Sequence, residues 1–146
     1  MFTSRRLLFF GLAGAIALGA AGFLSDFVLY QTFVLPQLLP GLRSVPMEWW
    51  IGVMVPLLLS PLLLGYASRS VGLVLASASG GTAGLVTYEF VMAHLNQPGH
   101  LKSYAVEDPV FFFTTHTVMV FAVVLVVVLV GFGVGRMVHG GVRVIT

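Results

Sequence analysis

The chain has 146 residues, of which 58% are hydrophobic and only 8% are charged, and its mean hydropathy is +1.03. Soluble domains carry about 25% charged residues, so the composition excludes a soluble fold and predicts an all-α integral membrane protein. The lack of cysteine excludes disulfides and thiolate chemistry. Seven basic residues against five acidic ones are too few for a nucleic-acid footprint.

The first half of the chain contains two long apolar runs. Residues 7–30 follow the pair Arg5 and Arg6, and this run is longer than the 7–15-residue core of a secretion signal, so we interpret it as the first transmembrane span. Residues 31–48 contain three prolines and predict an irregular connection. The second span, residues 49–66, includes Pro56 and Pro61, where the loss of a backbone donor predicts a kink.

The second half of the chain contains two further apolar runs. The link at 67–70 is so short that the second and third spans must be antiparallel neighbours. The third span covers residues 71–92 and the fourth covers residues 110–137. Between them, residues 93–109 form a polar connection that is long enough for a short surface helix. The sequence therefore predicts a bundle of four transmembrane helices in a single domain.

Charge placement predicts the orientation of this bundle. With the amino terminus in the cytoplasm, five of the seven basic residues lie on the cytoplasmic side, as the positive-inside rule requires. These are Arg5, Arg6, Arg69, Arg136 and Arg143. We therefore expect both termini to be cytoplasmic, in the inner membrane of a bacterium or archaeon.

Small residues recur four apart in three of the spans, a spacing that lets helices approach closely in lipid. They are Gly11, Ala15 and Gly19 in the first span, Gly80 and Gly84 in the third, and Gly131 and Gly135 in the fourth. We expect these positions to pack helices within the chain or to contact a partner chain.

Two acidic residues lie inside the predicted spans, where charge is costly and therefore a candidate for function. They are Asp26 and Glu89. On a helix, Glu89 shares a face with Thr82 and Ala78, so we expect it to face protein and not lipid. The structural alternative is a helix–helix hydrogen bond or an interfacial carboxylate.

Two histidines, His94 and His116, fall near the same predicted membrane level as these acids. Neutral imidazoles on adjacent helices can ligate haem b, or can join Asp26 and Glu89 around a metal ion. Glu89 and His94 are five residues apart, however, which places them on different faces of one helix. The alternative is an interfacial histidine at 94 and a packing role at 116. We find no spacing that indicates a catalytic residue.

These features favour an accessory or structural subunit of a larger respiratory, photosynthetic or membrane-oxygenase complex, with lipid and other membrane subunits as its partners. One alternative is a small homo-oligomeric transporter or channel. Another is an electron-transfer subunit that binds haem or a quinone through His94 and His116.

Overall fold

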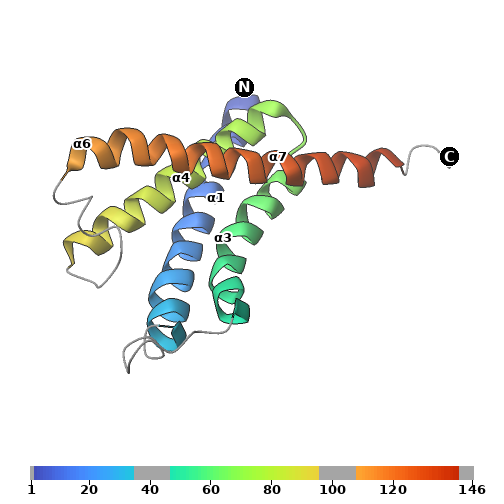
Figure 1. Ribbon diagram of the computed structural model, residues 1–146. Coiled ribbons are helices and arrows are strands. Elements are labelled where there is room, and N and C mark those ends of the chain that lie inside the picture. Colours follow the sequence, from blue (N-terminus) through green and yellow to red (C-terminus); the bar gives the residue numbers. More distant parts are fainter. Residues whose placement is uncertain (1, 35–46, 96–107, 142–146) are drawn as a thin grey trace.

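The computed structural model describes residues 2–34, 47–95 and 108–141, and within these ranges the chain is helical and has no β-strand. Four of its helices are long and apolar enough to cross a membrane (Figure 1). The candidate spans are Ser4–Tyr30, Trp50–Ala67, Val71–His94 and Pro109–Gly140. The prediction of an all-α fold with four such helices is therefore confirmed, and the orientation with both termini in the cytoplasm stays a prediction.

The elements follow one another with few interruptions. Helix α1 (Phe2–Gly22) continues directly into a π-helix, η1 (Phe23–Val34). Helices α3 (Met47–Ala67) and α4 (Val71–His94) come next. A short helix, α6 (Pro109–Phe111), leads through a π-helical turn, η2 (Phe112–His116), into α7 (Thr117–Gly141). The last three elements therefore form one continuous helix.

Most helix boundaries differ by a few residues from the predicted spans. The first helix continues to Val34 and does not end at residue 30, and α3 begins at Met47. The polar residues after position 30 do not stop the helix because none of them up to Val34 removes a backbone donor. Helix α4 ends at His94, with Leu95 as its C-cap. The remaining parts of the two predicted connections, 35–46 and 96–107, lie outside the described residues, as does the expected surface helix between the third and fourth spans.

Prolines in the second span do not interrupt its helix. Pro56 and Pro61 both lie inside α3, which is one α-helix from Met47 to Ala67. The hydroxyl of Ser60 donates to the carbonyl of Pro56 at 2.8 Å, a bond back to the preceding turn. The helix is therefore continuous past both prolines, and the expected kink stays a prediction.

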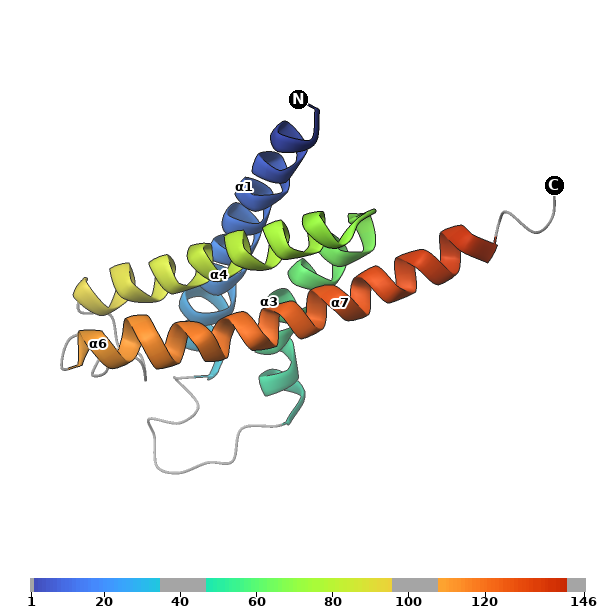
Figure 2. The ribbon, with the colours of Figure 1, turned by 90° about the horizontal axis from the view of Figure 1, so that it is seen from above.

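The helices pack as two crossed pairs, α1 with α4 and α3 with α7 (Figures 1 and 2). In the first pair, Gly80 lies against Gly11 and Gly84 lies against Ala15, so the residue numbers rise together and the helices run parallel. In the second pair the partners also run parallel, because Leu62 faces Gly131 and Tyr66 faces Gly135. The first span therefore packs most extensively on the third, and the second span on the fourth.

Glycine allows both crossings. A β-carbon at Gly80 would collide with the Gly11 carbonyl, and one at Gly84 would collide with the carbonyl of Ala15. The other predicted small residues lie at the same crossings, Gly19 against Gly84, Gly131 against Leu62 and Gly135 against Tyr66. The chain's own helices thus occupy all seven predicted packing positions, and Gly80 and Gly84 face α1, so they do not offer an open surface to a partner.

The core lies where the two pairs meet. It contains Leu18 of α1, Val74 and Ala78 of α4, and Val124 and Val128 of α7. Leu64 of α3 packs against its edge. These contacts hold the acidic end of α4 beside the start of α7, where the candidate site is found.

Charges separate to the two ends of the fold. The described acids, Asp26, Glu48, Glu89 and Asp108, lie on helix segments that adjoin the two long connections, and we call this the acidic end. The described arginines, Arg5, Arg6, Arg69 and Arg136, lie toward the opposite helix ends, which we call the basic end. This separation agrees with the charge pattern on which the orientation was predicted.

Candidate functional site

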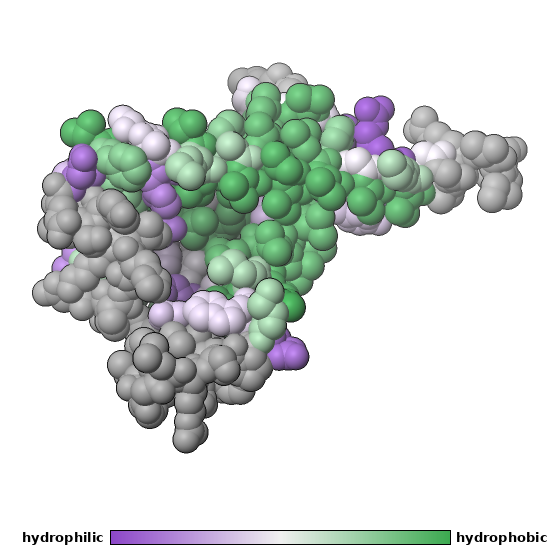
Figure 3. All heavy atoms as spheres, viewed as in Figure 1, coloured by the Kyte–Doolittle hydropathy of each residue, from purple (hydrophilic) through white to green (hydrophobic). Residues whose placement is uncertain are grey.

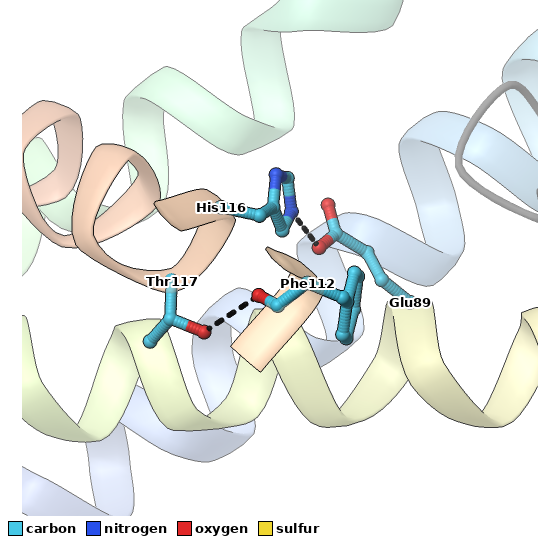
Figure 4. A network of polar contacts seen from close by, with 4 residues as sticks. All are labelled: Glu89, Phe112, His116 and Thr117. Atoms are coloured by element: carbon cyan, nitrogen blue, oxygen red, sulfur yellow. Dashed lines mark hydrogen bonds and ion pairs between the residues drawn. The ribbon is translucent and has the colours of Figure 1, made fainter. Parts of the chain in front are cut away.

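A contact between a histidine and a carboxylate joins η2 to α4 at the acidic end. The Nε2 atom of His116 lies 2.7 Å from Oε2 of Glu89, and the two side chains point toward one another (Figure 4). Their side chains are only 18% and 15% exposed, respectively. This confirms that Glu89 faces protein, and it identifies His116 as its partner.

The π-helical turn sets the position of His116. The backbone N–H of Thr117 donates to the carbonyls of Phe112 and Thr114, and the first of these bonds spans five residues. The Thr117 hydroxyl also donates to the Phe112 carbonyl, at 3.2 Å (Figure 4). The fully buried Phe112 ring stacks on the His116 imidazole with 5.1 Å between centroids. The imidazole is therefore held between an aromatic face and a carboxylate. Such π-turns often occur at functional sites.

A second polar contact lies one residue away on α4. The hydroxyl of Tyr88 donates to Oδ2 of Asp26 at 3.0 Å, which ties η1 to α4. We refer to Asp26, Tyr88, Glu89 and His116 as the polar cluster. Two of its members, Asp26 and His116, lie on π-helical segments. The cluster thus links three parts of the chain that are far apart in the sequence.

The polar cluster can hold a proton in more than one place. If His116 is neutral, its Nε2–H donates to the Glu89 carboxylate, and if His116 is charged, the same contact is an ion pair. Both side chains are largely removed from water, so loss of either one would leave the other polar group buried without a partner, which costs free energy. The geometry suits proton binding or a rigid link between helices.

His94 lies apart from the polar cluster. Its Nδ1 is 2.8 Å from the carbonyl of Phe90 on its own helix, and its ring packs on the Phe90 ring at 4.1 Å. Among the described residues, no three His, Asp or Glu side chains are placed to hold one metal ion. The structure thus brings together Asp26, Tyr88, Glu89 and His116 and leaves His94 outside. A haem or metal at these residues stays a prediction.

One buried hydroxyl belongs to the residue that precedes Asp26 in the sequence. Ser25 is only 1% exposed, and within the described part of the chain its hydroxyl has no hydrogen-bond partner. Tyr88 and Ser25 are the residues here that the sequence analysis missed. A tyrosine beside Glu89, at the predicted level of Asp26, was the available signal for the first, and nothing in the sequence singled out Ser25.

Comparison with known protein families, curated proteins and solved structures finds no match to this chain. Function must therefore be argued from the fold and the geometry of the described residues.

Proposed function

We propose that this chain is an accessory subunit of a larger membrane complex, and that it docks on its partner through one face of α7. The observation that carries the proposal is an apolar stripe along that helix. Its residues are exposed and recur at helical spacing over about five turns. They are Met119, Val123, Val126, Val130, Val134 and Met137, and we call them the α7 stripe.

The helix face that carries the α7 stripe also contains a glycine that packing within the described chain does not require. A β-carbon at Gly133 would meet no atom within 4 Å, unlike one at Gly131 or Gly135. Glycine inside a helix costs about 0.5–1 kcal/mol relative to alanine. A second helix approaching at Gly133 would offset that cost, because a missing side chain lets two backbones come close.

The valines of the α7 stripe support the same proposal. Their side chains have essentially one rotamer on a helix, so they lose little conformational freedom when another helix packs against them. Lipid tails adapt to any side chain and gain nothing from this rigidity. Figure 3 shows a broad hydrophobic surface over α3 and α7 in the same view as Figure 1.

Photo-crosslinking tests this proposal. A photoreactive residue at Val126 should crosslink in the native membrane to one other membrane protein, in a yield comparable to the amount of the chain. The matched control is Leu12 on α1, which is 55% exposed compared with 58% for Val126. Crosslinks to lipid alone at both positions would contradict docking through α7. A product of twice the chain's mass would replace the accessory role with a homo-oligomer.

A second candidate function is proton-coupled transport by such a homo-oligomer, and the Glu89–His116 pair favours it. Ionisable groups inside a span often belong to proton or ion pathways, and the Ser25 hydroxyl, which has no hydrogen-bond partner among the described residues, lies next in sequence to Asp26. Liposomes that contain only this chain test it, with a pH-sensitive dye inside. Proton uptake that is lost in Glu89→Gln and kept in the exposed-site variant Val91→Leu would establish transport. No uptake above that of empty liposomes would reject it.

A further inference from the structure

The basic end contains a hollow that neither proposed function uses. It has a volume of about 950 Å³ and lies where the last turn of α3 meets the last turns of α7. Its lining includes Tyr66 and Arg69 from the α3 side and Arg136 and His139 from α7. We call it the basic hollow.

Close contact between the two helices shapes the basic hollow. A β-carbon at Gly135 would lie 2.7 Å from the carbonyl oxygen of Tyr66, so α7 and α3 almost touch there. Farther along, the rings of Tyr66 and His139 lie 5.4 Å apart between centroids. The Nδ1 atom of His139 is 2.7 Å from the Gly135 carbonyl, which orients the ring and leaves Nε2 for another partner. These contacts within and between α3 and α7 therefore fix the walls of the basic hollow.

The charges in the basic hollow are not neutralised by the described part of the chain. Arg69 and Arg136 are both exposed, and across residues 2–34, 47–95 and 108–141 neither has a carboxylate within 4.0 Å. The Arg136 guanidinium lies 5.6 Å from the centroid of the Phe132 ring, a cation–π contact that holds it near α7. The described acids all lie at the other end of the fold. Two guanidinium groups beside one hollow thus attract an anion.

We propose that the basic hollow binds the phosphate of an anionic phospholipid headgroup. The planar guanidinium fork matches the oxygens of a phosphate, and two arginines can grip it from different helices. The α3 surfaces that lead up to the hollow are apolar, since Leu63, one turn before the hollow, is 56% exposed and Leu59, one turn earlier, is 47% exposed. Acyl chains attached to the phosphate would lie along these surfaces, whereas free phosphate would gain nothing from them. These apolar contacts favour the lipid as the source of the phosphate.

Native mass spectrometry of the chain in detergent tests this inference without depending on its orientation in a membrane. With phosphatidylglycerol added, one lipid should stay bound per chain, and phosphatidylcholine at the same concentration should not. The double variant Arg69→Gln/Arg136→Gln should lose the bound phosphatidylglycerol, by about tenfold or more in apparent affinity for each charged contact removed. The matched control is Arg5→Gln/Arg6→Gln, which removes the same charge from the exposed start of α1.

Three outcomes would overturn the inference. Equal loss of lipid in both double variants would mean that general surface charge, and not the basic hollow, attracts the lipid. Retention of phosphatidylglycerol by Arg69→Gln/Arg136→Gln would place the lipid elsewhere. Displacement of the lipid by millimolar inorganic phosphate would assign the site to free phosphate. The proposal would be supported if Arg5→Gln/Arg6→Gln keeps the bound lipid, if Arg69→Gln/Arg136→Gln loses it, and if inorganic phosphate does not displace it from the wild type. All variants are at exposed positions, so circular dichroism should show an unchanged helix content.

Discussion

Gly14 lies where α1 crosses α4, and an alanine there should destabilise the protein. A β-carbon at Gly14 would lie 2.5 Å from the Ser77 carbonyl oxygen and 2.9 Å from the Gly81 nitrogen, whereas ordinary contact begins at 3.4 Å. Both neighbours are backbone atoms, so they cannot rotate away. The helices must therefore separate by about 1 Å, a gap that forfeits a quarter to a half of each van der Waals contact. Overpacking of this kind costs about 1–3 kcal/mol, and we expect Gly14→Ala to lower the free energy of unfolding by that amount.

Two other glycines provide controls of opposite sign. Among the described residues, no atom lies within 4 Å of a β-carbon at Gly52 or Gly133, so alanine there should stabilise the isolated chain by about 0.5–1 kcal/mol through the lower flexibility of its unfolded state. Unfolding in detergent micelles with rising dodecyl sulfate, followed by circular dichroism, measures all three variants. A stability for Gly14→Ala at or above that of the wild type would refute the crossed α1–α4 contact.

Three further predictions concern the polar cluster and the membrane. In a double-mutant cycle, Glu89→Gln and His116→Gln should show a coupling of about 0.6–1.7 kcal/mol, the range of interhelical hydrogen bonds in membrane proteins; additive effects would mean that the pair contributes nothing. An impermeant maleimide should label Met47→Cys in intact cells and leave Ser4→Cys unlabelled, and the reverse pattern would invert the orientation. A visible spectrum of native material tests the haem alternative, because each of His94 and His116 has one ring nitrogen engaged within the chain and one left over; a band lost in both His94→Ala and His116→Ala would establish haem binding, and the lack of any haem band would reject it.

Hydrophobic length and charge were enough to predict the four helices. Each apolar run is too long to be anything else, and lipid requires every backbone group in it to be satisfied within the helix. The direction of Glu89 followed from its helical spacing to Thr82 and Ala78, both of which are buried. These are local properties, since they depend on residues within a few turns of one another.

The pairing of helices and the π-helical segments were not predictable in this way. The small-residue spacing of Gly80 and Gly84 fits any close neighbour, and only the fold shows that the neighbour is α1. The register of η2 depends on the position of Phe112 in the core and on the bond between Glu89 and His116. A one-residue change in hydrogen bonding has no signature in composition or periodicity. The partner of Asp26 was missed for the same reason, because Tyr88 is 62 residues away.

The α7 stripe offers the most direct test of the accessory role. Gly133→Leu fills open space in the chain itself, so the variant should insert and fold as the wild type does, yet hold a docked helix away by the width of the new side chain. Gly52→Leu also fills open space, but on α3 and away from the α7 stripe. The measurement is the amount of partner that copurifies with each variant from the native membrane in mild detergent. We predict that Gly133→Leu loses its partner while Gly52→Leu and the wild type retain it, and equal retention by all three would contradict docking through α7.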